Sequence, residues 1–450
     1  MNRRVLIIAC AFPPTGGPGV QRIAKFCKFL PRLGWRPTVW THRALPELPR
    51  DDTLLRDIPH DIEVIRTGAC AVETDVACGA VRYGRGTVAT AAQWCRRAAR
   101  WLRGPDWPDS HAPWARDSVA PLLRLAELRQ FDAVLSTFSP PSNHWLAWEI
   151  KQRTGLPWVA DFRDLWIDDY RYKPASRRHA AADRRFQQAV LDNADAVIGV
   201  TPRQTDILRS RAPDRAEVFH TITNGYDPDD FERAGLLSLD ALAARRSTSV
   251  FTLSHVGRLD QYRSGEALFE GLRRFQAAIA EESARFQLRV VGHLGRQAKS
   301  ELERFGISYV HTEYVRHGEA VREMMNAAAL LLTTPEGPNA DSVIPAKLFE
   351  YLAARRPILL VGPSTECERI VAECGAGVSA GRSAETIARQ LGEWFDLWRS
   401  GRGLRGVRTN SLRAYSRVEQ AKSLARLLEE LTMARAGILV DGDLGKAAVA

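Results

Sequence analysis

A proline-initiated helix with a carboxylate near its start stands in the stretch NADSVIPAKLFEYLAARR. Pro345 suits the first turn of a helix, because its missing N–H would have no partner there anyway. The amides of Val343, Ile344 and Ala346 would then point outward at the positive end of the helix, where a phosphate binds well. Glu350 follows about one and a half turns later, where its carboxylate can accept two hydrogen bonds from a diol such as ribose. The stretch therefore indicates a nucleoside diphosphate site, and the alternative is an ordinary turn with a solvated glutamate.

A second candidate for anion binding follows the first predicted strand. The apolar run from Val5 to Phe12 predicts a buried parallel strand, and an amphipathic helix begins near Val20. Between them lies PPTGGPG, whose glycines are Gly16, Gly17 and Gly19. A glycine-rich loop between a strand and a helix is typical of a phosphate or sugar cradle, although glycine in such a turn often serves only backbone geometry. The spacing does not fit the G-x-G-x-x-G fingerprint.

Polar residues follow two further predicted strands. His144 stands in the first turn of a helix after the strand that ends at Phe138, at the edge where parallel sheets bind ligands. Asp161, Arg163 and Asp164 follow the next strand, and such charges are costly there unless they are paired or lie in a cleft. His144 either contacts a ligand or caps its helix. The aspartates either orient a substrate hydroxyl, which we favour for Asp164, or hold Arg163 in an ion pair, which we favour for Asp161.

The second half of the chain repeats the pattern of strand, glycine and basic residue. The predicted strand from Val250 to Val256 ends at Gly257, and Arg258 and Arg263 follow before a helix begins near Glu266. Guanidinium groups beside a helix amino terminus bind anions well. This pattern predicts a second group of phosphate ligands.

Taken together, these motifs resemble the retaining glycosyltransferases of family 4. The matching motifs are DFRDLW at Asp161, NGYDPDDF at Asn224 and KLFEYL at Lys347. The resemblance covers about Val5 to Leu431, and it implies an α/β protein of the GT-B fold, with two Rossmann-like domains facing across a central cleft. It also implies transfer of a sugar from a nucleotide-sugar with retention of the anomeric configuration, without a metal.

The same resemblance implies roles for individual residues. The glycine loop would lie beneath the donor, and His144 would reach the donor sugar. Arg258 and Arg263 would hold the diphosphate, and the segment around Arg316 would contact the nucleobase. With Asp164 orienting the acceptor, the predicted catalytic residues are His144, Arg263 and Asp164. The predicted donor-binding residues are Gly16, Gly17, Gly19, Arg258, Arg263, Arg316, Ser342, Val343, Ile344, Lys347 and Glu350.

Two positions depart from the family pattern. Typical members have a lysine directly after the second arginine, where this chain has Ser264. Many members have two glutamates eight positions apart, and counting back from Glu350 leads to Ser342. Either Asp341 or Glu336 supplies an equivalent contact, or the donor is bound without one.

The order of predicted elements divides the chain into two α/β units. We expect an N-terminal acceptor-binding domain over residues 1–235 and a C-terminal donor-binding domain over residues 245–409. From the resemblance, a helix over about 410–431 is expected to pack back on the first domain. Residues 432–450 have weak patterning and are expected to form a tail.

Composition restricts the class of protein. The 63 Lys and Arg against 53 acidic residues give a net charge of +10, which indicates an anionic partner such as a phosphorylated sugar, anionic lipid or nucleic acid. Seven scattered cysteines without a C-x-x-C pair indicate neither a disulfide framework nor a zinc site. No apolar run approaches the roughly 18 residues of a membrane span, and no signal-peptide pattern follows Met1. We expect a cytoplasmic protein, with peripheral contact to the inner face of the membrane left open.

An Arg- and Trp-rich helix is predicted over residues 87–103, with Trp94, Trp101 and four arginines. Arginine and tryptophan on one short element are typical of a helix at an anionic membrane surface. The alternatives are a domain helix whose tryptophans are core, and a site for single-stranded nucleic acid. Because no recognition-module motif accompanies the helix, we expect no nucleic acid partner.

The predicted partners are therefore a UDP- or GDP-sugar and a glycan or lipid-linked acceptor, with no further cofactor. Three alternatives stay open at this point. A nucleotide-sugar epimerase would use the same donor site, and a non-catalytic subunit would explain the missing glutamate. A dinucleotide oxidoreductase is disfavoured, because Thr41 and His42 stand where the second strand should end in an acidic residue.

Overall fold

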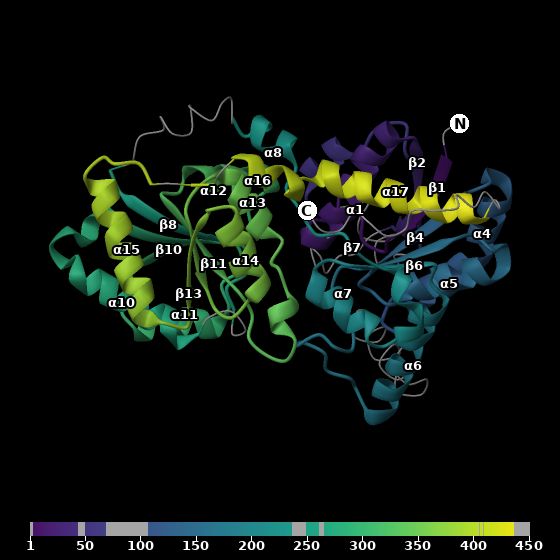
Figure 1. Ribbon diagram of the computed structural model, residues 1–450, viewed down its shortest axis with the longest axis horizontal. Helices are drawn as coiled ribbons and strands as arrows, with labels where there is room; N and C mark the ends of the chain where they lie inside the picture. The colour runs from purple at the N-terminus through teal and green to yellow at the C-terminus, as the bar shows by residue number, and fades with distance from the viewer. Residues whose placement is uncertain are drawn as a thin grey trace, which may run out of the picture.

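The computed structural model contains two α/β domains that lie side by side (Figure 1). It describes residues 3–43, 50–68, 107–235, 249–260, 265–404, 406–407 and 409–435. Arg263, Ser264, the predicted helix over residues 87–103 and the chain after Arg435 lie outside the described residues.

The first domain is built on a seven-stranded parallel sheet with the order β3-β2-β1-β4-β5-β6-β7. Its strands are β1 (Arg3–Ile8), β2 (Trp35–His42), β3 (Glu63–Thr67), β4 (Ala133–Phe138), β5 (Trp158–Phe162), β6 (Ala196–Gly199) and β7 (Phe219–Thr221). The central strands are buried on both faces, which explains their nearly continuous apolar sequences.

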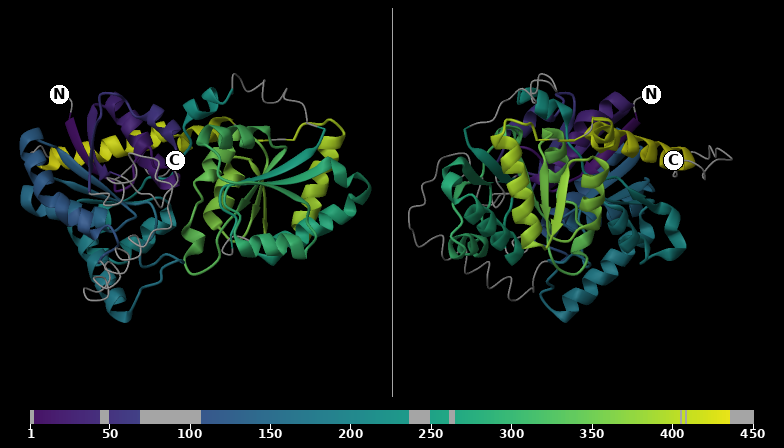
Figure 2. Two further views of the ribbon diagram at one scale, coloured as in Figure 1. Left: turned by 180° about the vertical axis from the view of Figure 1, so that it is seen from behind. Right: turned by 60° about the vertical axis from the view of Figure 1, so that its left-hand side comes forward.

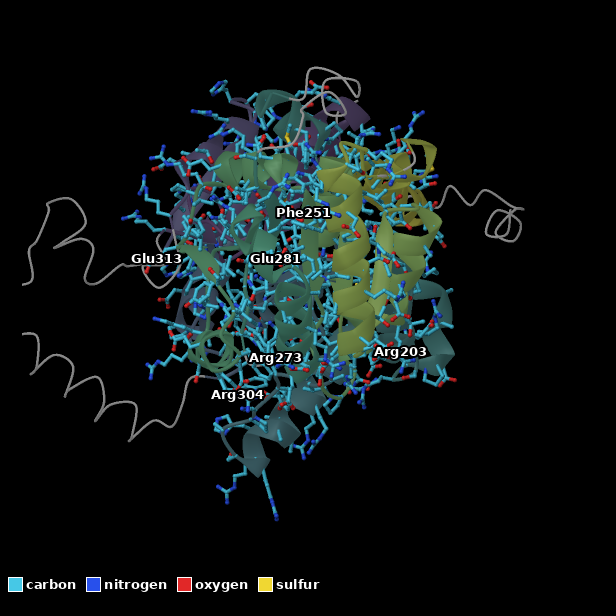
Figure 3. All side chains as sticks on the ribbon, turned by 90° about the vertical axis from the view of Figure 1, so that its left-hand side faces the viewer. Arg203, Phe251, Arg273, Glu281, Arg304 and Glu313 are labelled. Atoms are coloured by element: carbon cyan, nitrogen blue, oxygen red, sulfur yellow. The ribbon has the colours of Figure 1, made fainter. Side chains whose placement is uncertain are left out.

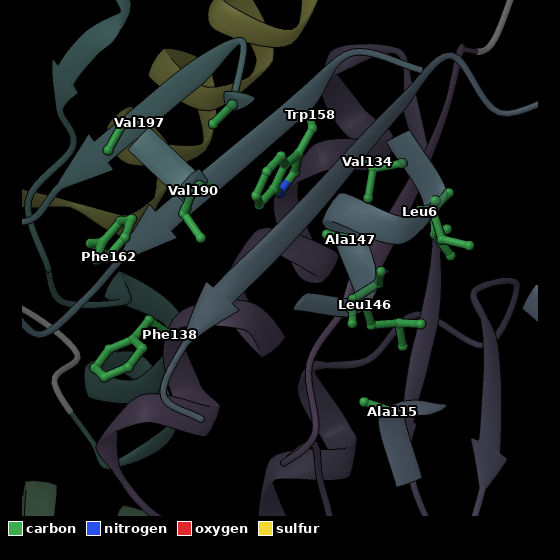
Figure 4. Packing of buried hydrophobic residues seen from close by; sticks show 14 of the residues in the cluster. Leu6, Ala115, Val134, Phe138, Leu146, Ala147, Trp158, Phe162, Val190 and Val197 are labelled. Atoms are coloured by element: carbon green, nitrogen blue, oxygen red, sulfur yellow. The ribbon is translucent and has the colours of Figure 1, made fainter. Parts of the chain in front are cut away.

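Helices cover both faces of this sheet. One face packs against α4 (Ala112–Arg129), α5 (Ser142–Thr154) and α6 (Arg177–Asn193), in a core that contains Trp158 and Phe162 (Figure 4). The other face packs against α1 (Pro18–Phe29). The remaining described helices of this half are η1 (Leu30–Leu33), η2 (Asp52–Asp57), α7 (Pro202–Arg209), η3 (Pro213–Val218) and α8 (Pro228–Arg233).

The second domain has a six-stranded parallel sheet with the order β10-β9-β8-β11-β12-β13. Its strands are β8 (Phe251–Val256), β9 (Phe286–Val291), β10 (Tyr309–Thr312), β11 (Ala329–Thr333), β12 (Ile358–Val361) and β13 (Gly377–Gly381). One face carries α12 (His317–Asn326), α13 (Lys347–Ala354) and α14 (Thr365–Glu373). The other carries α10 (Glu266–Ala278), α11 (Arg296–Arg304) and α15 (Ala384–Arg399). Short helices η4 (Ala280–Arg285) and η5 (Ala340–Ser342) lie in its loops.

The last described helix lies on the first domain. After α16 (Thr409–Leu412) and η6 (Arg413–Tyr415), helix α17 (Arg417–Arg435) lies along that domain (Figures 1 and 2). Ala421, Leu424 and Leu428 of α17 share a core with Val5 and Ile23. The helix begins later than the predicted residue 410 and continues into the predicted tail. Among the described helices, none is long and apolar enough to cross a membrane.

The first strand is shorter than predicted. β1 ends at Ile8 instead of Phe12, although Ala9, Cys10 and Phe12 are buried. The Ala9 amide still donates to the Trp40 carbonyl, at 3.1 Å, but the Cys10 amide donates to Oδ1 of Asn143, at 3.0 Å, so the regular strand pairing ends here. The loop that carries the glycines therefore begins earlier and is longer.

Candidate functional site

The carboxyl ends of the two sheets face each other. Thr201, just after β6, donates a hydrogen bond of 2.9 Å to the carbonyl of Ser342, after β11. Nε of Arg203 and Oδ2 of Asp341 lie 2.7 Å apart. Loops after parallel strands are where α/β proteins bind ligands. The region between the two edges is therefore the candidate site.

Helix α13 presents its amino terminus in this region. The helix has no side-chain cap. The Val343 amide donates to the Ala340 carbonyl at 3.1 Å, so it does not point outward as predicted. In the described part of the chain, the amides of Ile344 and Ala346 donate to no carbonyl or side chain. Two amides at the positive end of a helix can bind an anion.

A lysine adds positive charge at the same place. Nζ of Lys347, the first residue of α13, lies 2.9 Å from Nε2 of the fully buried His255. Nδ1 of His255 lies 3.0 Å from the Leu331 carbonyl. Nε2 also lies 3.1 Å from the Arg258 carbonyl, so this ring nitrogen is close to both an ammonium and a carbonyl oxygen. A Cβ at Gly257, where φ is +122°, would lie 3.4 Å from Nζ, so the ammonium lies over this glycine turn.

The predicted arginine pair is described only in part. The side chain of Arg258 is 63% exposed, and its Nη1 lies 3.6 Å from Oδ2 of Asp260. Such an exposed and long ion pair holds the guanidinium weakly. Arg258 therefore has the freedom to bind an anion, whereas Arg263 lies outside the described residues.

Glu350 belongs to a charge cluster between the domains. Its side chain is 17% exposed, and Oε1 lies 3.7 Å from Nε2 of His317. The same His317 nitrogen lies 3.1 Å from Oδ2 of Asp230 in the first domain. Burial raises the pKa of the Glu350 carboxyl, although the charge of His317 opposes this effect. The predicted contact of Glu350 with a ribose stays a prediction.

The cluster continues in the first domain around Lys25 of α1. Its Nζ lies 2.6 Å from carboxylate oxygens of both Asp57 and Asp227, and 2.8 Å from Asp230. Among the described residues, these three aspartates are placed closely enough to hold a metal ion. Because the ammonium already lies among them, they form an ion-pair network. Burial lowers the pKa of Lys25, but the three carboxylates outweigh it and raise the pKa above its ordinary value.

The glycine loop contacts an arginine. A Cβ at Gly19 would lie 0.9 Å from Nη1 of Arg163, so only glycine fits there without moving that side chain. Arg163 donates to the carbonyls of Phe138, at 2.7 Å, and Ser139, at 3.2 Å. Gly17 has φ of +115° directly before α1, a conformation that favours glycine. Gly19 thus serves packing in this structure, and the predicted donor contact of the loop stays a prediction.

Asp161 has the structural role that we favoured, but with another partner. It is fully buried and its Oδ1 lies 2.9 Å from Nη2 of Arg22, which is also fully buried. Thr137 donates to its second oxygen at 2.9 Å. The ion pair with Arg163 that we considered for Asp161 is therefore wrong, because Arg22 of α1 occupies that side of the carboxylate.

The two predicted catalytic residues of the described first domain differ in exposure. The side chain of Asp164 is 39% exposed, with Oδ1 3.5 Å from Nη2 of Arg171. His144 is fully buried among Phe138, Trp158 and Phe162. Its Nδ1 lies 2.7 Å from Oγ of Ser136, and burial lowers its pKa to about 3. In this structure His144 is a buried, neutral residue whose predicted contact with the donor sugar stays a prediction, whereas Asp164 is partly exposed.

The segment around Arg316 binds the other domain. The amide of His317 donates to Asp51 at 3.2 Å, and the hydroxyl of Tyr314 donates to the same carboxylate at 3.4 Å. The Arg316 side chain is exposed. One backbone group that we expected to be available for a nucleobase is therefore engaged by Asp51.

Ser342 stands where many family members have the first glutamate, and its side chain is already hydrogen-bonded. Ser342 is buried, and its hydroxyl donates to the Asn339 carbonyl at 2.6 Å. Of the two proposed substitutes, Asp341 pairs with Arg203, and Glu336 lies 3.2 Å from Nε of Arg382. Both carboxylates therefore already have cationic partners in this structure.

Sequence reasoning missed several charged residues of this region. His255 is the one polar imidazole in the strand sequence FTLSHV, directly before a glycine turn, and that position was a usable signal. Arg22, Lys25 and Lys28 follow each other at intervals of three along α1, which indicates a charged stripe beside the apolar one. Their partners lie far along the chain and carry no local signal.

The fold and site define a two-domain α/β protein with a helix amino terminus at the domain interface. Residues 19–230 match the family model described as Glycosyltransferase Family 4, so the predicted resemblance is confirmed for the first domain. No curated protein matches the chain by sequence.

Solved structures of the GT-B fold match nearly the whole chain. Sucrose-phosphate synthase from Thermosynechococcus elongatus is 16% identical, with 96% of this chain and 100% of that chain covered, and a TM-score of 0.61. A glycosyltransferase from Rickettsia africae is 12% identical, with coverages of 95% and 98% and a TM-score of 0.60. Anabaena HepE, solved in complex with UDP and glucose, is 14% identical, with coverages of 95% and 100% and a TM-score of 0.57. The predicted α/β GT-B fold with two Rossmann-like domains is confirmed.

Proposed function

We propose that this protein is a retaining glycosyltransferase that moves a sugar from a nucleoside diphosphate sugar to a hydroxyl group. UDP is the donor nucleotide that we favour, with GDP as the alternative, because HepE of the same fold is solved with UDP-glucose. The acceptor is a glycan or a lipid-linked glycan. The observation that carries the proposal is the amino terminus of α13, where two amides and the Lys347 ammonium meet.

These groups suit the chemistry of the leaving diphosphate. When the bond between the sugar and the phosphate breaks, negative charge grows on the phosphate oxygen. Fixed donors that face this oxygen stabilise the transition state more than the ground state. In our proposal, Ile344, Ala346 and Lys347 act on the phosphates, and Glu350 accepts hydrogen bonds from the ribose. Protein cations thus supply the positive charge, so the reaction proceeds without a metal.

The acceptor binds on the first domain. Asp164 follows β5 at the carboxyl edge of the first sheet and is 39% exposed. A carboxylate in this position can accept the hydrogen bond of the attacking hydroxyl and orient it. Arg163, which lies against the glycine loop, fixes the adjoining backbone through the carbonyls of Phe138 and Ser139.

A screen of nucleotides tests this function. The melting temperature of the protein is measured with UDP, GDP, ADP and TDP and their sugar conjugates, because a ligand that binds the folded state raises it. The expected result is that one nucleotide and its sugar conjugate raise the melting temperature together. With that donor, product analysis in the presence of a glycan acceptor should show a sugar transferred with its configuration retained. An inverted linkage would contradict the proposal.

A nucleotide-sugar epimerase is the second candidate. The solved structure of a putative UDP-N-acetylglucosamine 2-epimerase from Listeria monocytogenes is 12% identical, with coverages of 97% and 98% and a TM-score of 0.54. Incubation of the protein with nucleotide-sugar alone separates the two candidates. A new sugar stereoisomer formed without any acceptor would favour the epimerase, whereas an unchanged sugar favours transfer.

A further inference from the structure

Helix α6 carries four arginines on its outward face. Arg177, Arg178, Arg184 and Arg185 are all exposed. Arg177 and Arg184 are seven residues apart, as are Arg178 and Arg185, so both pairs repeat after about two turns. The opposite face of the helix is buried, through Ala180, Asp183, Phe186, Gln187, Val190 and Leu191. The arginines therefore form one continuous basic strip, which we call the α6 strip.

The α6 strip forms no ion pairs among the described residues: none of its four guanidinium groups lies within ion-pair distance of a carboxylate. Asp183, the acidic residue within the strip's sequence, is buried and accepts from Trp107 and Tyr172. Several exposed arginines of the second domain pair with a glutamate on the same helix, as Arg273, labelled in Figure 3, does with Glu270. The further pairs are Arg274 with Glu270, Arg369 with Glu366 and Glu373, and Arg389 with Glu393, whereas the exposed Arg296 and Arg322 form no ion pair among the described residues.

The strip also opposes the helix dipole. Arg177 and Arg178 are the first two residues of α6, directly after the capping residue Ser176, and the first turn contains no acidic residue. Cations at a helix amino terminus are unfavourable, because the dipole is positive there. The dipole acts on Arg177 and Arg178, so folding gives no reason for these two cations at this place, whereas an anionic partner would compensate them.

The position of the strip indicates the shape of that partner. Helix α6 projects from the edge of the first domain (Figures 1 and 2). Lys173, in the loop before it, is also exposed. A projecting row of positive charges contacts a flat anionic surface more readily than it encloses a single strand of nucleic acid. Among the described residues, none of the large exposed hydrophobic side chains lies on α6, so no aromatic platform is present for stacked bases.

We propose that the α6 strip binds the surface of a bilayer that contains anionic phospholipid. The guanidinium groups contact lipid phosphates, while no part of α6 inserts among the acyl chains. The contact is electrostatic, so it weakens as salt shortens the range of the charges. The inference concerns a surface outside the candidate site, and it holds whether or not the protein transfers a sugar.

Vesicle co-sedimentation of the full chain tests the proposal. The vesicles contain phosphatidylglycerol and phosphatidylcholine at low salt, with pure phosphatidylcholine as the reference. One basic residue near an anionic surface contributes about a fivefold change in partitioning. The variant Arg177→Gln/Arg178→Gln should therefore bind about twenty-five-fold more weakly. The matched control Arg273→Gln/Arg274→Gln removes the same number of charges from paired positions, and its binding should change less than about twofold.

Folding is checked by the melting temperature. The α6 variant should melt no lower than the wild type, because it removes cations from the positive end of a helix. Equal loss of vesicle binding in both variants would assign the effect to net charge and overturn the proposal. Unchanged binding of the α6 variant, or wild-type protein that binds RNA but no anionic vesicles at low salt, would overturn it too.

Discussion

The positively charged groups on the two sides of the domain interface have different partners. On the first domain, Arg22 and Lys25 are buried and surrounded by carboxylates of their own domain, at 2.6–2.9 Å. On the second domain, Nζ of Lys347 lies against His255, and two amides beside it have no acceptor among the described residues. The charges of the first side are paired within their domain and hold the structure together. The two amides of the second side are open to a ligand, and this contrast indicates the candidate donor site.

The largest effect is expected on the first side. Replacing Arg22 by Met leaves Asp161 buried without its cation, and removal of one partner of a buried pair costs about 3–5 kcal/mol. The free energy of unfolding from a denaturant titration measures this loss. The double variant Arg22→Met/Asp161→Leu should recover part of it, because no unpaired charge remains. If Arg22→Met had nearly wild-type stability, the buried ion pair would not stabilise the protein, and the contrast between the two sides would be wrong.

On the second side, binding should change instead of stability. Lys347→Ala removes a charged hydrogen-bond donor, which contributes about 1.5–3 kcal/mol to an anionic ligand. We expect UDP affinity to fall at least about tenfold in a calorimetric titration, with little change in melting temperature. Lys299→Ala, an exposed lysine on α11, serves as the control and should bind UDP like the wild type. If the wild type and Lys347→Ala bound UDP with equal affinity, Lys347 would have no role in the proposed site.

Much of the fold could be predicted from the sequence. Strands β1, β4, β5 and β8 follow predicted strands of the sequence analysis, because parallel strands buried on both faces contain few polar residues. β3 was missed, since it is an edge strand whose Glu63 and Arg66 break the apolar run. Helix α4 was missed because Pro121 lies inside it, and proline normally ends a helix.

The candidate site was predicted less completely. The start of α13 could be read from Pro345 and from the helical pattern after it. The partners of Lys25 could not, because Asp227 and Asp230 lie about two hundred residues away in the sequence. The burial of His144 could not be predicted either, since it depends on Trp158 and Phe162 of a neighbouring strand. Local patterns define elements, while contacts between elements decide which polar residues remain available.

The pH dependence of stability sharpens the comparison at His317, where the two sides meet. Burial lowers its pKa, but the hydrogen bond to Asp230 and the charge of Glu350 outweigh it and raise the pKa above 6.5. A raised pKa stabilises the folded protein fully below about pH 6.5, and the contribution is lost as the pH rises through the folded-state value. His317→Gln should therefore cost about 1–2 kcal/mol at pH 6 and less at pH 9. A cost that grows with pH would contradict the assigned ion pairs.

The smallest effect is expected at the exposed rim of the interface. Arg203 and Asp341 join the domains at 2.7 Å, but their side chains are 53% and 37% exposed. Exposed pairs contribute about 0–1 kcal/mol. Arg203→Ala should therefore change the free energy of unfolding by less than about 1 kcal/mol. A larger loss would mean that the rim, and not the buried network, holds the domains together.

The position of the diphosphate in a crystal of the protein grown with UDP tests the central claim most directly. Our account predicts phosphate oxygens within hydrogen-bond distance of the Ile344 and Ala346 amides, with the Lys347 ammonium beside them. A diphosphate that lies on the glycine loop of the first domain, away from α13, would contradict the account.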